Sequence, residues 1–317
     1  MYSIEELSFI AYNNRSMDGV VKNFIPHDID IEKLLKIESI LSHLRKVFYE
    51  QKFIEIERSD LNENADDIII YPQDIKNLKE KILNSRLNNI ELDYLVNRGI
   101  KKDTIEKWNL SGLSSISNYQ DLIILNATCH PVLNKIIEDG VEGGGIIIPL
   151  FKNGELINCA IRKISDIGKL KYSLACPDID VWGIEDIENE EIYITEGLFD
   201  MMALRSIGFK SASVSSAMWS GIQLYKLIQN NPKFINIFCD NDSVGLKTGF
   251  ILHKFFNIIG INNKTIVSEK FKDASEHIFQ NKMNMDTIVD ININLSMIDE
   301  STNDFNLGSY LKNRKFN

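Results

Sequence analysis

The 317-residue sequence has few cysteines and none of the cysteine or histidine spacings that hold zinc. Its four cysteines, Cys129, Cys159, Cys176 and Cys239, include no CxxC pair, and its five histidines share no metal-binding spacing. Scattered cysteines argue against a zinc ribbon or a disulfide scaffold and are typical of reducing compartments. We therefore expect no zinc site.

Long apolar runs are also missing. No stretch of 18 apolar residues occurs, so we expect no transmembrane helix. The opening segment MYSIEELSFIAYNNRSMDG lacks a cationic start followed by an apolar block, so we expect no secretory signal. The pattern GxxxxGK[ST] is absent, which argues against a P-loop ATPase.

Positive charge is in the minority. Lys and Arg number 35 against 45 Asp and Glu, giving a formal net charge of −10. Such a balance argues against a protein that coats DNA through bulk charge. It remains compatible with a nucleic-acid enzyme, because metal-binding carboxylates add negative charge and a basic groove can be local.

Hydrophobic residues make up 44% of the chain, which is enough to build a sizeable core. Apolar residues at helical spacing predict a helix over residues 29–51, and the polar stretch 59–67 is the best first linker. Gly99 is predicted to separate two short helices within 73–109. From residue 143 the pattern predicts a β-hairpin around the turn KNGE, followed by a short strand at LKYSLA.

From residue 190 the chain alternates strand and helix. The alternation predicts a parallel sheet covered by helices. The predicted strands are 191–195, 211–215, 234–239 and 264–268, and the predicted helices are 199–207, 221–229 and 244–260. The remaining residues, from about 284, are polar and predict a loosely ordered tail.

Acidic residues follow three of these strands: Glu196, then Asp240 and Asp242, then Asp273. Ligands of open parallel sheets bind beyond the carboxyl ends of the strands, and residues two apart in an extended segment point to the same side. Converging carboxylates need a cation, and oxygen ligands favour Mg²⁺ or Mn²⁺. The pattern therefore points to phosphoryl or nucleotidyl transfer. The alternative for a lone DxD is a helix N-cap beside a solvated acid.

The series EGLFDMMAL, SVSS, FCDNDSVG and FKDASEH resembles a Toprim domain, the metal-binding fold of bacterial-type primases, topoisomerases and some nucleases. Its motif forms are most similar to those of bacterial and phage primases. The resemblance implies catalytic roles for Glu196, Asp240 and Asp242, and metal binding by these three and Asp273. It leaves open whether Glu196 is a metal ligand or a general base. Asp200 is either a catalytic residue or a first-turn acid favoured by the helix dipole.

The upstream segments LDYLVNRGIKKDTIEKWNL, GIIIPLFKNGELINCAIRKI and GKLKYSLACPDIDVWGI resemble the part of primases that precedes the Toprim domain. Between residues 151 and 172, five basic residues stand against two acids, which makes a local basic patch. Such a patch suits phosphates, and a tyrosine in it could stack on a base. An ordinary solvated hairpin is the alternative. The resemblance implies template or nucleotide binding by Arg98, Arg162, Lys163, Lys171 and Tyr172.

The resemblance covers roughly residues 86–283 and implies an α+β protein. An α/β Toprim domain, a parallel sheet flanked by helices, would follow a smaller mixed hairpin and helix subdomain and a helical N-terminal region. The expected boundaries are 1–80 for the helical N-terminal region, 81–189 for the basic subdomain, 190–283 for the Toprim domain and 284–317 for the polar tail.

The implied function is that of a DNA primase-like nucleotidyltransferase, which makes short RNA primers on single-stranded DNA for replication by a two-metal mechanism. Its ligands would be the single-stranded template, ribonucleoside triphosphates and Mg²⁺ or Mn²⁺, without zinc. A replicative helicase is a further candidate partner, and no membrane is expected. The expected location is the cytoplasm, that of the host if a phage encodes the chain.

The sequence departs from primases in several ways. A zinc ribbon is missing, no helicase follows, residues 1–80 show no resemblance to these primases, and Ser216 stands where primases often have a glycine-containing loop. Two other functions stay open. The chain could be a Toprim nuclease whose metals activate water, or an inactive single-stranded-DNA-binding or helicase-partner protein.

Overall fold

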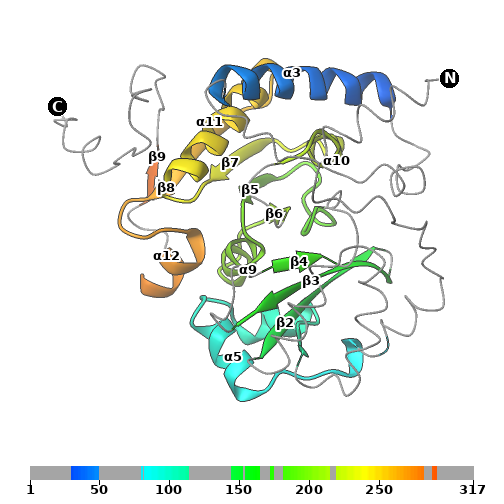
Figure 1. Cartoon of the computed structure of the whole chain (residues 1–317), viewed down its shortest axis with the longest axis vertical. Helices are drawn as coiled ribbons and strands as arrows, with labels where there is room; N and C mark the ends of the chain where they lie inside the picture. The colour runs from blue at the N-terminus through cyan, green and yellow to red at the C-terminus, as the bar shows by residue number, and fades with distance from the viewer. Residues whose placement is uncertain are drawn as a thin grey trace, which may run out of the picture. The chain divides into compact units, whose positions relative to one another are not determined.

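The computed structural model describes residues 30–49, 80, 82–113, 144–152, 154–164, 172–174, 181–214, 219–281 and 288–290 (Figure 1). These residues divide into two compact units, which we describe separately. One unit contains residues 31–48 together with the described residues from 181 onward, and the other contains the described residues between 80 and 174. Among the described helices, we find no apolar segment with the length that a membrane crossing requires.

The larger unit is built on a five-stranded sheet with the order β6-β5-β7-β8-β9. The first four strands in this order are parallel, and β9 pairs with β8 in the antiparallel direction. The predicted parallel sheet is confirmed. The strands are β5 (Glu191–Thr195), β6 (Ser211–Ser213), β7 (Phe234–Phe238), β8 (Asn263–Ser268) and β9 (Ile288–Asp290).

Strand β9 corrects the predicted boundary at residue 283. Residues 288–290 were expected to belong to the polar tail, and they instead form the edge strand beside β8. The sequence TIVDININL around this strand does alternate apolar and polar residues, which is a strand signal that the prediction of a polar tail overlooked. Pairing with β8, a long-range contact, decides that these residues are extended.

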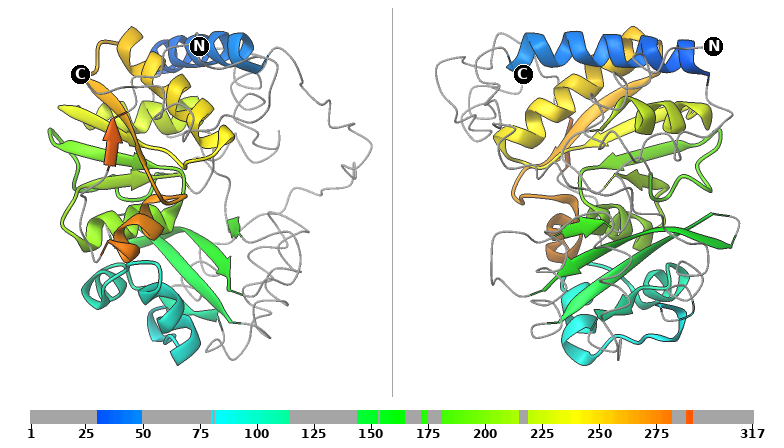
Figure 2. Two further views of the ribbon diagram at one scale, coloured as in Figure 1. Left: turned by 90° about the vertical axis from the view of Figure 1, so that its left-hand side faces the viewer. Right: turned by 45° about the vertical axis from the view of Figure 1, so that its right-hand side comes forward.

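Helices cover both faces of the sheet. They are α9 (Leu198–Ser206), α10 (Gly221–Gln229), α11 (Ser243–Ile258) and α12 (Ala274–Gln280). Figures 1 and 2 show α9 and α12 on one face and α10 and α11 on the other. Ile192 and Ile194 of β5 and Ile235 and Ile237 of β7 are buried between these layers. Helix α12 was not predicted, since its seven residues are too few to show helical periodicity.

Helix α3 (Ile31–Tyr49) confirms the helix predicted over 29–51, and it lies along α10 and α11 in the larger unit (Figure 1). Its buried residues include Leu34, Ile37 and Leu41. The Glu38 carboxylate is 2% exposed and accepts a hydrogen bond of 2.9 Å from the Gly221 amide. Arg45 donates to the Trp219 carbonyl at 2.6 Å. This part of the predicted 1–80 region therefore belongs to the sheet unit instead of forming a region of its own.

The smaller unit has an antiparallel sheet in the order β1-β2-β3-β4. The predicted hairpin and the strand after it are present as β2 (Gly145–Lys152), β3 (Glu155–Lys163) and β4 (Tyr172–Leu174), beside the two-residue β1 (Ser111–Gly112). Helices α5 (Asn89–Val96) and α6 (Lys102–Lys107) are separated at Gly99, whose φ of 72° is easily adopted only by glycine.

Glu91 ties α5 to this sheet. Its carboxylate completes a capping box with Asn88 and also accepts a hydrogen bond from the Gly145 amide at 3.3 Å. The side chain is fully buried. A carboxylate that accepts backbone N–H groups from a helix start and from β2 fixes both elements in one position.

Candidate active site

The carboxyl ends of three neighbouring strands carry the predicted acidic residues. From β5 the chain passes through α9 to β6 on one side and then through α10 to β7 on the other side of β5. The direction of winding therefore reverses between β5 and β7, and such a switch point is where open α/β sheets bind ligands. Glu196 follows β5 directly, and Asp240 and Asp242 follow β7. Asp273 lies five residues after the end of β8, which is the other neighbour of β7.

Glu196 is the most unusual carboxylate of this group. Burial, followed by the charges of Asp242 and Asp200, raises its pKa to about 7. Its Oε1 atom is buried and has no hydrogen-bond partner. A Cβ atom on Gly245 would lie 2.8 Å from this oxygen and 2.5 Å from the Asp240 carbonyl oxygen. Only glycine therefore lets α11 begin so close to Glu196.

Asp240 shares this environment. Burial, and then the charges of Glu196 and Asp273, raise its pKa to about 7. Lys272 opposes this effect, because its Nζ lies 3.8 Å from Asp240 Oδ2 and 3.4 Å from Asp242 Oδ2. Partial burial lowers the pKa of Lys272, but the two carboxylates outweigh it, and the net pKa is raised. Lys272 was missed by the sequence reasoning, although it stands directly before Asp273 in FKDASEH.

Asp242 and Asp273 are both helix N-caps, in line with the alternative interpretation of the DxD. Asp242 Oδ1 accepts from the Val244 and Gly245 amides at 3.1 and 3.0 Å, at the start of α11. Asp273 Oδ1 accepts from the Glu276 amide at 2.7 Å and from the Ser275 hydroxyl at 2.9 Å, at the start of α12. In Asp242 the cap uses Oδ1, while Oδ2 is the oxygen that faces Lys272. Capping therefore orients this carboxylate within the site.

Asp200 and Asn241 connect the loops that carry these residues. Asp200 is 8% exposed and accepts a hydrogen bond of 2.8 Å from the Ser275 amide, which joins α9 to α12. The Asn241 amide donates to the Lys272 carbonyl at 2.6 Å, and its side chain donates to the Ser268 carbonyl at 3.2 Å. Asp200 is confirmed as a first-turn acid of α9, and its hydrogen bond to the Ser275 amide adds a positioning role that was not predicted.

Residues 193–278 match a family model described as Toprim-like. This part of the chain is a Toprim-like domain. No curated protein sequence matches the chain. Among solved structures, the chain is similar to a DnaG primase catalytic domain bound to ssDNA, with 13% identity over 67% of this chain and 74% of that one and a TM-score of 0.51. It is also similar to a DNA primase domain from Pseudomonas aeruginosa, with 14% identity over 68% and 79% and a TM-score of 0.51. The predicted Toprim-domain primase core is thus confirmed at the level of the fold.

The donor set of the Toprim-like domain fits a hard divalent cation. Its candidate ligands are carboxylate oxygens, the type that Mg²⁺ and Mn²⁺ prefer. A cation would also stabilise the charged forms of Glu196 and Asp240 and would give the partnerless Glu196 Oε1 a ligand to bind. Within the described ranges, no three His, Cys, Asp or Glu side chains are already arranged to hold a metal ion. The ammonium group of Lys272 supplies the positive charge between Asp240 and Asp242.

The predicted basic residues belong to the smaller unit, and two of them meet at one tyrosine. Arg162 Nε donates to the Tyr94 hydroxyl at 3.2 Å, and the Arg98 guanidinium lies 5.6 Å from the centroid of the Tyr94 ring. Backbone pairing places Tyr172 opposite Arg162, while the Tyr172 side chain and Lys171 lie outside the described residues. Lys163 corrects the prediction, because it is 2% exposed and offers no accessible ammonium group for a phosphate. Its place next to Arg162 in an extended strand turns it to the opposite face.

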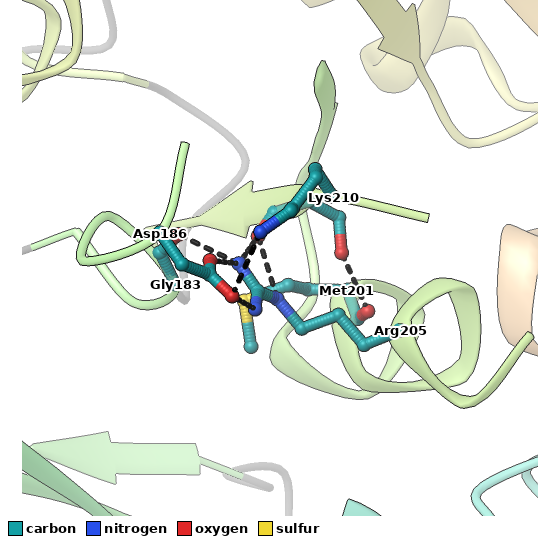
Figure 3. Close-up of polar contacts among 6 residues, drawn as sticks. Gly183, Asp186, Met201, Arg205 and Lys210 are labelled. Atoms are coloured by element: carbon teal, nitrogen blue, oxygen red, sulfur yellow. Dashed lines mark hydrogen bonds and ion pairs between the residues drawn. The ribbon is translucent and has the colours of Figure 1, made fainter. Parts of the chain in front are cut away.

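A second charged cluster in the larger unit is structural. Figure 3 shows Arg205 of α9 beside Asp186, with bonds of 2.8 and 3.1 Å from its terminal nitrogens, and Arg205 also donates to the Gly183 and Ser211 carbonyls. Lys210 lies 3.3 Å from the same carboxylate. Burial raises the pKa of Asp186, but Arg205 and Lys210 bring it below its ordinary value. Because Ser211 is the first residue of β6, this cluster holds the start of β6 against α9.

Proposed function

We propose that the chain is a DNA primase-like nucleotidyltransferase that joins ribonucleotides into short primers on single-stranded DNA with the help of Mg²⁺ or Mn²⁺. The observation that carries the proposal is the position of Glu196 and of Asp240 with Asp242 on the two sides of the sheet's switch point. The shared fold of primase catalytic domains supports it. Single-stranded DNA and ribonucleoside triphosphates are the ligands that this function requires.

In this reaction the 3′-hydroxyl oxygen of one nucleotide attacks the α-phosphorus of the next, and the bond to pyrophosphate breaks. Metal ions, when bound, supply charge stabilisation at the attacking and leaving oxygens. Asp240 and Asp242 would hold them, with Asp273 assisting. Glu196 would either be a further ligand or accept the hydroxyl proton.

Primer synthesis from labelled ribonucleotides on single-stranded DNA, with Mg²⁺ or Mn²⁺, tests the proposal. Asp240→Asn keeps the shape of the side chain and removes its charge, so we expect a loss of at least about 100-fold in rate. Glu188→Gln is the matched control, because Glu188 is an exposed carboxylate of the same unit. Full activity of Asp240→Asn would contradict the assignment.

The family match covers only the Toprim-like part of the chain, so the nuclease and the inactive binding protein stay open. Two further measurements separate them from a primase. The carboxylate site could activate a water molecule instead of a nucleotide hydroxyl. Metal-dependent degradation of plasmid DNA or of RNA without primer formation would favour the nuclease. Tight DNA binding that EDTA leaves unchanged, with neither activity, would favour the inactive binding protein.

A further inference from the structure

In the smaller unit, two arginines from distant parts of the sequence share one tyrosine. Tyr94 lies in α5, Arg98 follows that helix by two residues, and Arg162 lies in β3. The Tyr94 hydroxyl accepts a hydrogen bond of 3.2 Å from Arg162 Nε. The Tyr94 ring lies 5.6 Å from the Arg98 guanidinium carbon. One side chain therefore interacts with both guanidinium groups, each through a different part of the tyrosine.

The backbones of all three residues are held independently of any ligand. Arg98 lies in the turn that ends α5, where its amide donates to the Leu95 carbonyl at 3.0 Å. Arg162 is paired with Ile146 on one side and with Tyr172 on the other. Helix α5 is itself joined to β2 through Glu91, one turn before Tyr94. The arginine side chains have many rotamers, so a fixed backbone does not by itself fix where their guanidinium groups lie.

The chemistry of the Tyr94 side chain allows it to hold both guanidinium groups in place. Two guanidinium groups repel each other, whereas an aromatic face attracts one cation and a phenol oxygen accepts a hydrogen bond from another. A hydrogen bond to Nε also fixes the plane of the Arg162 guanidinium. Planar guanidinium groups bind phosphate oxygens through paired N–H groups, so their orientation decides how well they bind.

We propose that Tyr94 is a positioning residue that holds Arg98 and Arg162 together as one phosphate-binding pair. The inference rests on the proposed function only for the source of the phosphate, which is either the DNA backbone or the triphosphate of a nucleotide. Holding both arginines before the ligand arrives removes part of the ordering cost of binding.

Two substitutions separate the two interactions of Tyr94. Tyr94→Phe removes the hydroxyl and keeps the ring, and Tyr94→Leu removes both. Fluorescence anisotropy of the full chain with an oligo-dT probe, in EDTA and over a range of salt, measures phosphate binding without any catalysis. If the phosphate is that of DNA, we expect affinity to fall about threefold to tenfold for Tyr94→Phe and further for Tyr94→Leu. The salt slope should become less steep by about 0.7 for each phosphate that the variant no longer neutralises.

A double-mutant cycle tests the coupling. Arg162→Gln should weaken binding less in the Tyr94→Phe background than in the parent chain, because the hydrogen bond is already missing there. Tyr225→Phe is the matched control, since Tyr225 lies under Lys33 in the other unit and should leave binding unchanged. The cycle is measured on the constant that Tyr94→Phe changes, which is either the oligo-dT affinity or the nucleotide KM. Additive effects of Arg162→Gln and Tyr94→Phe on that constant would overturn the proposal.

A second experiment, which compares the nucleotide KM with the oligo-dT affinity of Tyr94→Phe, identifies the source of the phosphate. If the pair binds a nucleotide triphosphate, Tyr94→Phe should raise the KM for ribonucleotides with kcat unchanged and leave oligo-dT affinity unaltered. If it binds DNA, oligo-dT affinity falls and the nucleotide KM stays constant. The proposal is overturned if neither quantity changes in Tyr94→Phe, including the case in which only the melting temperature falls.

Failure of the proposed function gives a different result. Asp240→Asn should abolish synthesis and keep oligo-dT affinity, because the arginine pair is not touched. A chain that makes no primers but binds oligo-dT through Tyr94 would therefore refute the primase proposal and leave the arginine pair standing.

Discussion

The Toprim-like domain gathers carboxylates around Lys272, and the smaller unit gathers two arginines around Tyr94. The two sites differ in burial. Glu196 and Asp240 are buried enough for their pKa values to rise to about 7, and the lysine beside Asp240, Lys272, is itself 60% exposed. Tyr94, Arg98 and Arg162 are all half-buried. Like charges near water can be held by hydrogen bonding and stacking, while buried like charges need a cation or a proton.

The two sites also obtain their precision in different ways. Asp242 and Asp273 are oriented by the helix starts that they cap, so backbone N–H groups position two of the four carboxylates of the acidic site. In the arginine pair, the Tyr94 side chain contacts both guanidinium groups. We therefore expect the acidic site to tolerate backbone changes poorly and the arginine pair to depend on Tyr94.

The largest effect is expected from Gly245→Ala. The added Cβ atom would lie 2.5 Å from the Asp240 carbonyl oxygen, so Asp240 or the start of α11 must move. We expect a loss of about 1–3 kcal/mol in the free energy of unfolding and of at least about 100-fold in primer synthesis. Urea denaturation and the synthesis assay measure the two effects.

Gly260→Ala is the control for this change. Gly260 also lies in the Toprim-like domain, with a φ of 79° and open space around its Cβ position. It should cost about 1 kcal/mol of backbone strain and leave primer synthesis intact. Equal losses of activity in both variants would show that the close approach at Gly245 is unimportant.

Glu196→Gln tests the burial of negative charge. The pKa of Glu196 rises from 4.5 to about 7 in the folded chain, so its contribution to stability is complete below pH 4.5 and is lost as the pH rises through 7. At pH 8 in EDTA the neutral glutamine should therefore stabilise the chain by about 1–3 kcal/mol. Mg²⁺ should reduce this difference, because it stabilises the wild-type carboxylate. A variant that is less stable than wild type at pH 8 would contradict the argument.

Glu38→Gln makes the same chemical change where the carboxylate has a partner. Glu38 accepts the Gly221 amide at the start of α10, where a negative charge is stabilised by the helix dipole. We expect a loss of about 1 kcal/mol in urea denaturation, the opposite sign to Glu196→Gln. Glu32→Gln, an exposed residue of the same helix, is the control and should change stability little.

The smallest effect is expected from Lys272→Met, which removes the cation between Asp240 and Asp242. Because Lys272 is largely exposed, we expect a loss of only about 0.5–1 kcal/mol at pH 8 and low salt. High salt should shrink the loss, since it screens exposed charges. Lys270→Met, an exposed lysine of the same loop, is the control for the removal of one positive charge. Matching losses in the two variants would show that no specific contact is involved.

Much of the Toprim-like domain could be predicted because its signals are local. The apolar runs at 191–195 and 234–239 are strands in the structure to within one residue, and the helix at 221–229 has the predicted bounds. Gly208 and Gly260 end helices with φ values of 95° and 79°, as their positions in the sequence indicated. Each of these features depends on residues a few positions apart.

The predictions failed where the cause is a distant contact. Lys163 is buried because β3 turns that face into the unit. Asp200 is the first-turn acid that one of its two predicted roles described, but the local sequence does not show its partner, an amide 75 residues away. Lys272 and Tyr94 were missed because nothing in their local sequence shows which charges lie beside them.

The sequence by itself determined that strand–helix alternation would build a parallel sheet and that three of its strands would each be followed by an acidic residue. Only the tertiary structure decided that β5 and β7 are neighbours at the switch point, that Lys272 lies between two of the carboxylates, and that Tyr94 joins Arg98 to Arg162. The physical reason is the distance along the sequence over which each interaction acts. Hydrophobic periodicity and capping act within a few residues, whereas burial, charge and hydrogen bonding act between whichever groups the fold brings together.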